Sequence, residues 1–323
     1  MVKYLVVAGI LKLFSSCSMM KNLYRFLGNT MGAKLRSKEG LPVSYMKRVC
    51  EFLPLLRKYV SNSEGARFLE IGTGWIHWES IFIRLFYPTN IVLFDICDNR
   101  QLGALKQYFT EFSNLIDKNI AMSPSESANV HLLLNSILSV NSFAELYHLL
   151  GFQYVVEPSG RLCHFEEGSF DVLFSCNCLE HIDKNILTEY IQSFYRLLKP
   201  GGYSIHTIDI GDHLSYYAKQ VSFKNYLKYS DTIWRRHFEN KVQYFNRLQK
   251  PYWLNLFQEA GLELVEAESL SCNIRSLKID KKYAPLSKSD LECITLKVVH
   301  RKPNPSRHPD PVSVSGRGGT GRE

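Results

Sequence analysis

The stretch Arg67-Phe-Leu-Glu-Ile-Gly-Thr-Gly-Trp75 constrains the fold of this chain more than any other. A short apolar run that closes on G-x-G indicates a buried strand followed by a tight turn, where missing side chains let a ligand approach the backbone. Apolar residues then recur at helical spacing from Ile81 to Phe86. We therefore expect a helix after the turn, with its free N–H groups directed at the bound molecule. Strand, turn and helix make half of a βαβ unit.

The glycine turn alone does not identify the ligand. The dinucleotide-binding pattern G-x-G-x-x-G is not met, because His77 stands at the third glycine position. A second apolar strand, residues 90–95, ends at Asp95. A carboxylate at this strand tip is placed to accept hydrogen bonds from the two ribose hydroxyls of an adenosine. The alternative is that Asp95 caps the following helix.

Composition narrows the class of protein. The 323 residues are 45% hydrophobic and 22% charged, which is typical of a soluble globular protein and excludes a disordered chain. The net charge of +8 fits an acidic or phosphorylated ligand or a membrane surface, and is too diffuse to favour nucleic acid. The eight cysteines form no C-x-x-C pair, so free thiols in a reducing, cytoplasmic setting are expected.

Residues 1–64 are predicted to form a helical cap. Lys12 interrupts the apolar start of the chain and no A-x-A site follows it, so the segment predicts neither a cleaved signal peptide nor a membrane-spanning helix. We expect instead one amphipathic helix from Leu11 to Leu27, resting on the domain or on a membrane surface. A second helical stripe, residues 42–59, leads into the first strand.

The middle of the chain continues the α/β pattern. Residues 99–151 read as helices and exceed a simple crossover, which predicts an insertion beside the active site. A third strand follows at 151–158. The fourth, 170–176, runs into polar residues at its carboxyl end, where open α/β sheets bind ligands.

The helix after the fourth strand is expected to be capped by Asp183 and to stop at a turn, residues 199–202, before a fifth strand at 203–209. Residues 213–256 are aromatic and basic, which predicts a lid over a flat or sugar-like acceptor, a base-stacking surface, or the core of an accessory helical layer.

Two closing strands are expected at 261–267 and 292–299, the second alternating in the manner of an edge strand. Residues 301–323 are of low complexity and predicted to be disordered.

The ordered set of motifs resembles the class I S-adenosylmethionine-dependent methyltransferases over residues 68–209. The set is L-E-x-G-x-G, an acid after the second strand, G-S-F-D-x-x-x-S followed by L-E-H, and L-L-K-P-G-G. A bacterial subgroup of unknown acceptor is also similar, through G-T-G-W, L-G-x-x-Y-x-V, H-x-I-D-x-x-D-H and N-R-L. The resemblance implies an α/β, Rossmann-like sheet of seven strands, mostly parallel with the last strand antiparallel, and helices on both faces.

S-adenosylmethionine is the cofactor that the resemblance implies. At the glycine turn, Glu70 would orient the loop and hold the methionine amino end through water, and the chain would pass close to that end at Gly72, Thr73 and Gly74. Asp95 would take the ribose hydroxyls. The other implied contacts are Ile96 on the adenine face, Ser159 or Glu157 at the adenine edge, and Ser175 and Asn177 near the sulfonium methyl group. The adenine-edge loop departs from the commoner G-D pattern.

Methyl transfer is an in-line displacement, so holding the acceptor on the S–CH₃ axis and excluding water supply most of the catalysis. An oxygen or nitrogen acceptor with a proton to lose also needs a base, and a histidine paired with a carboxylate is suited to that role. The candidate residues are His181 after the fourth strand and His206, Asp209, Asp212 and His213 around the end of the fifth. A purely structural role for His181 is the alternative.

A metal site is not expected. Asn177-x-x-Glu180-His181 resembles the E-x-x-E-H of ubiquinone-pathway O-methyltransferases and small-RNA methyltransferases, which carry a divalent ion. Here Asn177 replaces the first glutamate and removes a charge that a hard cation would require.

The sequence thus predicts a methyltransferase domain at 65–300 that acts on an oxygen or nitrogen atom of a small-molecule, glycan or lipid-linked acceptor. An acidic or phosphate-bearing acceptor would suit the aromatic lid and the positive charge. An RNA methyltransferase and a non-catalytic scaffold of the same fold are the alternatives. No recognised RNA-binding appendage is present, so a nucleic-acid partner is not expected.

Overall fold

The computed structural model describes residues 1–60 and 65–304. Within these ranges, seven strands form one sheet in the order β3-β2-β1-β4-β5-β7-β6. The strands are β1 (Arg67–Ile71), β2 (Asn90–Asp95), β3 (Phe152–Val156), β4 (Phe170–Cys176), β5 (Leu198–Asp209), β6 (Glu263–Ser271) and β7 (Cys293–Arg301). Strands β1 to β5 are parallel, and β7 lies antiparallel between β5 and β6. The predicted seven-stranded, mostly parallel sheet is confirmed.

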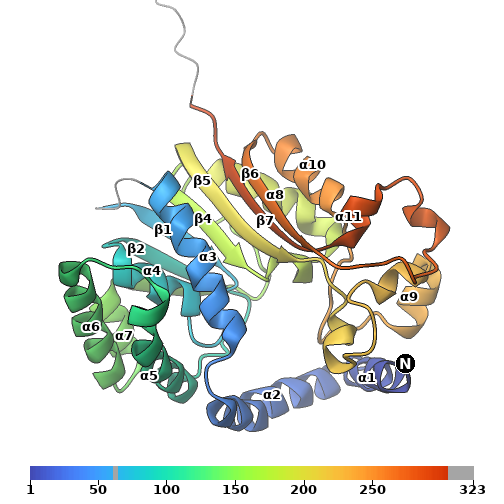
Figure 1. Cartoon of the computed structure of the whole chain (residues 1–323), viewed down its shortest axis with the longest axis horizontal. Helices are drawn as coiled ribbons and strands as arrows, with labels where there is room; N and C mark the ends of the chain where they lie inside the picture. Colours follow the sequence, from blue (N-terminus) through green and yellow to red (C-terminus); the bar gives the residue numbers. More distant parts are fainter. Residues whose placement is uncertain (61–64, 305–323) are drawn as a thin grey trace, which may run out of the picture.

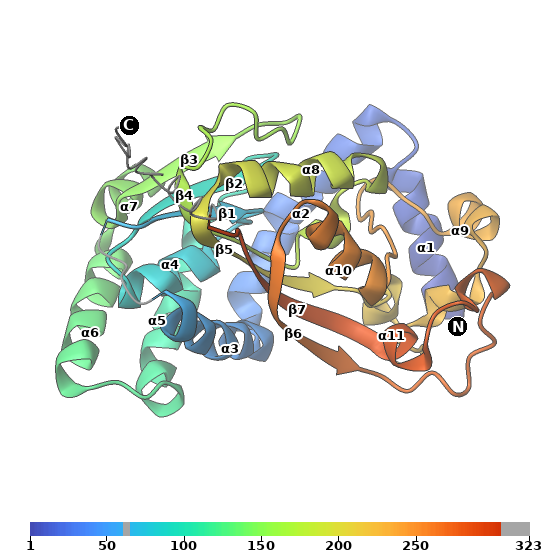
Figure 2. The ribbon, with the colours of Figure 1, turned by 90° about the horizontal axis from the view of Figure 1, so that it is seen from above.

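Helices cover both faces of this sheet (Figures 1 and 2). The α-helices of the described residues are α1 (Val2–Phe14), α2 (Ser18–Glu39), α3 (Val43–Tyr59), α4 (Trp78–Phe86), α5 (Leu102–Asn119), α6 (Pro124–Ser139), α7 (Phe143–Leu150), α8 (Lys184–Leu197), α9 (Asp231–His237), α10 (Lys250–Glu259) and α11 (Lys288–Glu292). Because successive strand residues point to opposite faces, Phe68 packs with α3 to α7 and Leu69 packs with α8 and α10. The predicted insertion, 99–151, forms α5, α6 and α7.

The prediction of one amphipathic helix from Leu11 to Leu27 was wrong. The chain breaks between α1 and α2, and the direction of the helix axis changes by 117° at the break. Ser15 explains the break: its hydroxyl donates to the Leu11 carbonyl at 2.8 Å and accepts the Lys241 N–H at 2.8 Å, so the first helix ends against a distant loop. Among the described residues no single helix is long and apolar enough to cross a bilayer, and only the bent pair passes by length and composition.

Two details of the sheet also differ from prediction. Residues 199–202 lie inside β5 rather than in a turn before it, and an irregularity in pairing with β4 accommodates them. Gly201 N–H donates to the Lys302 carbonyl at 2.9 Å, so the chain at 301–304 is paired here. The remaining tail, 305–323, lies outside the described residues, as do 61–64. At this end of the sheet the edge strand is β6, because β7 inserts between it and β5.

An accessory layer joins α1 to the segment after β5. Its short helices are η2 (His213–Tyr217), η3 (Asn225–Lys228) and η4 (Lys281–Tyr283). Tyr226, Trp234 and Phe238 form its buried core with Tyr4, whose hydroxyl donates to Asp212 at 2.8 Å. Several aromatics of the predicted lid are therefore core residues. Others remain exposed on the surface, namely Tyr216, Tyr217, Phe223 and Tyr252.

Candidate functional site

The glycine turn after β1 contacts the ends of the two neighbouring strands, β2 and β4. Gly72 N–H and Thr73 N–H both donate to the Phe94 carbonyl of β2, at 2.9 and 3.2 Å. Gly72 has φ +75°, and a Cβ atom there would lie 2.3 Å from the Cys178 Sγ after β4. Only glycine fits this position, because both the left-handed backbone and the close approach exclude a side chain.

Glu70 orients this turn from within the core. It is 1% exposed, and its Oε2 accepts hydrogen bonds from the hydroxyls of Thr73 and Ser80, at 2.8 and 2.5 Å. Burial, reinforced by nearby Glu79, raises the pKa of Glu70. Glu70 therefore bonds directly to the turn, whereas its contact with the methionine end of a cofactor stays a prediction.

His77 stands at the position of the missing third glycine of the dinucleotide-binding pattern. Its φ is +49°, in the left-handed region, and it is the residue just before α4. Its ring bonds to the Thr73 hydroxyl through Nδ1 at 2.7 Å and to the Tyr147 hydroxyl of α7 through Nε2 at 2.8 Å. Because Thr73 donates its only hydroxyl proton to Glu70, the His77 Nδ1 carries a proton and Nε2 accepts from Tyr147. Burial lowers the pKa of His77 to about 3, which keeps the ring neutral.

Asp95 lies beside the turn at the tip of β2. Its carboxylate accepts the Gly74 N–H at 3.0 Å, the Ile96 N–H at 2.8 Å and the Cys97 N–H at 3.3 Å. The next helix, α5, begins seven residues later with Gln101 at its N-cap, so Asp95 does not cap it. The helix-capping alternative is thus excluded for α5, and the ribose-binding role of Asp95 stays a prediction.

The predicted adenine contacts lie together next to Asp95. Ile96 is 52% exposed, and a Cβ at Gly160 would lie 3.6 Å from its Cγ2. The Ser159 N–H donates to the Glu157 carboxylate at 2.9 Å within the same exposed loop. An apolar side chain thus faces a polar loop, which is an arrangement able to accept a flat ring and its polar edge.

Ser175 and His206 do not face this site. The His206 ring is 1% exposed and stacks between Phe194 and Phe257 on the α8 side of the sheet, with centroids 5.1 and 5.4 Å away. Its nitrogens bond to the hydroxyls of Ser175 and Ser204, at 2.8 and 2.6 Å. Burial lowers its pKa well below the usual value. The structure separates both residues from the other candidates because strand alternation turns them into the core.

Asn177 directly follows β4 and has φ +50°, and its N–H donates to the Thr207 carbonyl at 2.8 Å. Two residues later the 3-10 helix η1 (Leu179–His181) begins. The left-handed turn at Asn177 redirects the chain so that η1 lies beside the end of β5.

His181, Asp209 and His213 converge at the carboxyl ends of β4 and β5. The His213 ring lies 5.0 Å from the His181 ring and packs on Phe245 at 4.5 Å. His213 Nε2 is 3.4 Å from Asp209 Oδ2, and the Tyr216 hydroxyl also bonds that carboxylate. Burial opposes ionisation of Asp209, but its bond with His213 holds the pKa of the carboxyl below its usual range.

Glu180 joins this cluster, and the set of catalytic residues predicted from the sequence omitted it. The Glu180, His181 and His213 donor atoms lie within 4.8 Å of one another. Glu180 is 2% exposed, and burial followed by the nearby Asp209 raises its pKa well above the usual value. Its place in L-E-H was the available signal. Asp212, in contrast, is fully buried and bonded to Tyr4, so it serves the accessory layer.

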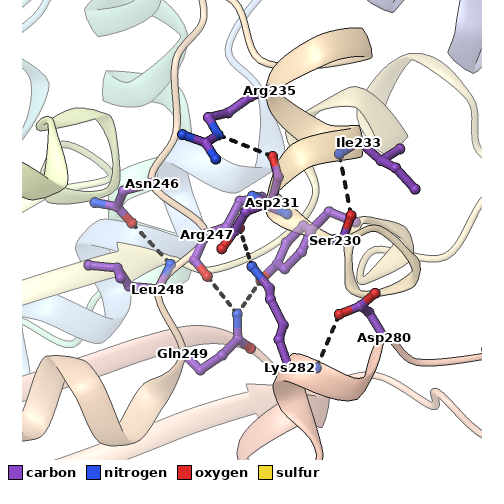
Figure 3. A network of polar contacts seen from close by, with 11 residues as sticks. Ser230, Asp231, Ile233, Arg235, Asn246, Arg247, Leu248, Gln249, Asp280 and Lys282 are labelled. Carbon is purple, nitrogen blue, oxygen red and sulfur yellow. Dashed lines mark hydrogen bonds and ion pairs between the residues drawn. The ribbon is translucent and has the colours of Figure 1, made fainter.

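The segment 244–249 holds the cluster in place from the outside. The Tyr244 carbonyl accepts the His181 Nδ1–H at 2.6 Å, and Asn246 N–H donates to the Glu180 carbonyl at 2.8 Å. Figure 3 shows how this segment is fixed: Arg247 pairs with Asp231 at 2.5 Å, and Lys282 bonds the same carboxylate. The N-R-L motif thus links the accessory layer to the cluster.

Fold and site together define a class I S-adenosylmethionine-dependent methyltransferase. A family model described as a methyltransferase domain matches residues 43–267, so the chain belongs to that family. It is a methyltransferase that uses S-adenosylmethionine. No curated protein sequence matches this one.

Solved structures with similar folds are distant in sequence. One is Haemonchus contortus phosphoethanolamine N-methyltransferase 2 with S-adenosylmethionine, at 16% identity and TM-score 0.43, covering 78% of this chain and 52% of that one. A second is a putative methyltransferase of Bacillus halodurans, at 15% identity and TM-score 0.41, covering 78% and 99%. A third is Burkholderia thailandensis 1,6-didemethyltoxoflavin N1-methyltransferase, at 15% identity and TM-score 0.43, covering 80% and 79%.

Proposed function

We propose that this enzyme methylates an oxygen or nitrogen atom of a small-molecule, glycan or lipid-linked acceptor, and that the acceptor binds against the His181, Asp209 and His213 cluster. One observation carries the proposal. Cys178, which touches Gly72 in the cofactor turn, is followed within three residues by Glu180 and His181. The cluster therefore begins next to the methionine end of the cofactor site, where the methyl group is transferred.

The cluster supplies the groups that the reaction needs. The His213 imidazole accepts a proton from the acceptor, and Asp209 at 3.4 Å stabilises the imidazolium that forms. The deprotonated acceptor atom then attacks the methyl carbon, while the sulfur–methyl bond breaks and its electron pair stays on sulfur. Burial between Phe245 and Tyr216 excludes water from the ring faces of His213.

An open groove of about 570 Å³ borders the cluster across Tyr244 and Phe245. Four cationic side chains line it, from Lys184, Arg235, Arg247 and Lys282, against three acidic ones, from Asp183, Asp231 and Glu239. We assign to this groove the acidic or phosphate-bearing part of the acceptor. The same proposal divides the chain into a cap at residues 1–64 and a methyltransferase domain at residues 65–300, with residues 213–256 as a lid over the acceptor.

Calorimetric titration with S-adenosylmethionine, S-adenosylhomocysteine and NADH tests the cofactor site. We expect micromolar affinity for the first two ligands and none for NADH. The Asp95→Ala variant should bind at least about 100-fold more weakly, because it loses two ribose hydrogen bonds to a charged group and the anchor of Gly74 N–H. Absence of binding to the native protein would instead favour the non-catalytic scaffold, and salt-sensitive binding to RNA would favour an RNA methyltransferase.

We further propose that the protein works in the cytoplasm at a membrane surface, on which α1 and α2 lie. Residues 1–38 contain seven lysines and arginines and no acidic residue. Large apolar side chains of these helices and of Met1 face solvent, with exposures of 46–76%. They are Met1, Val2, Leu5, Val6, Ile10, Leu13, Met19, Phe26, Met31 and Leu35. The two helices run along the lower edge of the molecule in Figure 1. Apolar exposure combined with positive charge fits the interface of an anionic bilayer.

Sedimentation with vesicles tests this surface. The protein should bind vesicles rich in phosphatidylglycerol, and a Leu13→Glu, Phe26→Glu double variant should bind at least about 10-fold more weakly, since it removes two interfacial apolar groups and adds two negative charges. Leu132→Glu on α6, at 68% exposure, is the matched control and should bind normally. Equal binding by all three proteins would contradict the proposal.

A further inference from the structure

Two buried polar atoms without hydrogen-bond partners belong to residues in the wall of the open groove beside Tyr244 and Phe245. One atom is Nη1 of Arg247, whose side chain is only 7% exposed. The other is the hydroxyl oxygen of Tyr283, a residue that is 5% exposed. Both residues line the groove of about 570 Å³. Because a buried donor without an acceptor lowers stability, two of them in one groove indicate a ligand that accepts hydrogen bonds there.

The other contacts of Arg247 fix its side chain in the groove wall. Its Nη2 donates to Asp231 at 2.5 Å (Figure 3). The central carbon of the guanidinium lies 4.5 Å from the centre of the Trp234 ring. One edge and one face of the guanidinium are thus occupied, while Nη1 remains unpaired. A side chain that is already fixed loses little conformational freedom when it binds a ligand.

Tyr283 and Lys282 bring further donors from η4. Burial raises the pKa of Tyr283, and the Arg247 guanidinium acts against this rise, so the hydroxyl keeps its proton and lies within electrostatic range of Arg247. Lys282 Nζ bonds Asp231 and lies 4.5 Å from the centre of the Tyr283 ring. The positive charges of Arg247 and Lys282 exceed the negative charge of Asp231, so this part of the wall attracts an anion.

We propose that Arg247, Lys282 and Tyr283 bind a phosphate monoester group of the acceptor. Such a group carries up to two negative charges and several acceptor oxygens, so it can accept from Nη1 and from the hydroxyl at once. The groove borders the proposed catalytic cluster across Tyr244 and Phe245, so an acceptor held by its phosphate extends toward that cluster. The inference deepens the proposed function and rests on it for the role of the phosphate as part of the acceptor.

The phosphate monoester can belong to a soluble molecule or to a membrane lipid. Lys12 of α1 donates to the carbonyls of Arg235 and Glu239, at 2.8 and 3.4 Å, and these two residues line the groove. One rim of the groove is therefore bonded to a helix for which we propose contact with a membrane. A lipid headgroup and a free metabolite present the same chemistry at this site and are distinguished by experiment.

Calorimetric titration with glycerol 3-phosphate tests the subsite without any methyl transfer. The full-length protein should bind glycerol 3-phosphate at one site and should not bind glycerol. Tyr283→Phe and Arg247→Lys should each weaken binding at least about 10-fold, because each removes a hydrogen bond to a charged group. Tyr195→Phe, which changes an exposed tyrosine on α8, is the matched control and should bind normally. Equal affinity of the native protein and the first two variants would overturn the subsite.

Urea denaturation separates a binding role of the Tyr283 hydroxyl from a structural one. Because this hydroxyl has no partner in the protein, Tyr283→Phe should unfold at the same urea concentration as the native protein or at a higher one. A clearly lower midpoint would show that the hydroxyl supports the fold, and would overturn its assignment as a phosphate ligand.

Vesicle binding distinguishes a lipid from a soluble ligand, because phosphatidic acid ends in a phosphate monoester and phosphatidylglycerol contains a diester. Stronger binding to phosphatidic acid at equal surface charge, lost in Tyr283→Phe, supports a lipid headgroup. Equal binding to both lipids, together with loss of glycerol 3-phosphate affinity in that variant, supports a soluble phosphate monoester.

S-adenosylmethionine titration of the same protein separates this inference from the proposed function. A native protein that binds the cofactor but not glycerol 3-phosphate or phosphatidic acid would overturn the subsite and leave the proposed methyl transfer intact. A protein that binds glycerol 3-phosphate through Arg247 and Tyr283 but does not bind the cofactor would overturn the proposed function and leave the anion site intact.

Discussion

A Gly72→Ala variant is expected to lose S-adenosylmethionine binding by at least about 100-fold and to unfold at lower denaturant concentration. Alanine there adds the strain of a left-handed residue, about 1 kcal/mol, and a Cβ that would meet Cys178 Sγ at 2.3 Å. The collision forces β1 and the end of β4 apart at the point where the cofactor turn is built. Urea denaturation and calorimetric titration measure the two effects.

Two further variants separate the effect of backbone strain at position 72 from that of the collision with Cys178. Gly168→Ala has a similar φ, +58°, with no atom within 4 Å of the added Cβ, so it should cost only about 1 kcal/mol of stability and leave cofactor binding intact. A Gly72→Ala, Cys178→Gly double variant removes the opposing side chain and should recover part of the lost affinity. If Gly72→Ala binds as well as Gly168→Ala, the close packing of the turn against Cys178 has no role in cofactor binding.

A His213→Ala variant is expected to lower kcat by about 100-fold or more, because the imidazole that takes the proton from the acceptor is lost. Cofactor affinity should change less than about twofold, because His213 lies in η2 after β5 and the predicted cofactor contacts lie at the ends of β1 and β2. The measurement is transfer of a labelled methyl group to an acceptor found by screening phosphorylated and glycan-containing metabolites.

His237→Ala is the matched control for this experiment, since it removes an imidazole at the end of α9. It should keep full activity. A His213→Ala enzyme with native kcat would show that the His213 imidazole takes no part in catalysis. Positioning of the acceptor alone would then account for the rate.

The parts of the fold that were predictable have a strong local pattern. The apolar runs that end at Ile71, Asp95 and Cys176 could be recognised because buried parallel strands are apolar on both faces. The break at Ser15 could not be predicted, because Ser15 accepts the Lys241 N–H from a segment 226 residues away. The position of β7 inside the sheet likewise depends on pairing between distant strands.

The candidate site was likewise predictable only where its residues are close in sequence. Glu70, Gly72 and Asp95 lie within one βαβ unit, so their spacing alone placed them together. His206 and Asp209 are only three residues apart, yet a strand directs them to opposite faces, and the sequence-based grouping of both in one cluster was wrong for that reason. Glu180 was omitted from the predicted catalytic residues because its burial beside Asp209 is a property of packing.

The histidine at position 77 makes the cofactor turn dependent on a distant helix. A glycine there would let the loop adopt its shape unaided, whereas this loop is bonded through the His77 ring to Tyr147 on α7. Opening of α7, measured by hydrogen exchange, should therefore deprotect the amides of Gly72 and Thr73 as well. The helical insertion and the nucleotide loop would then behave as one cooperative unit, so changes far out on α7 can tune how long the cofactor stays bound.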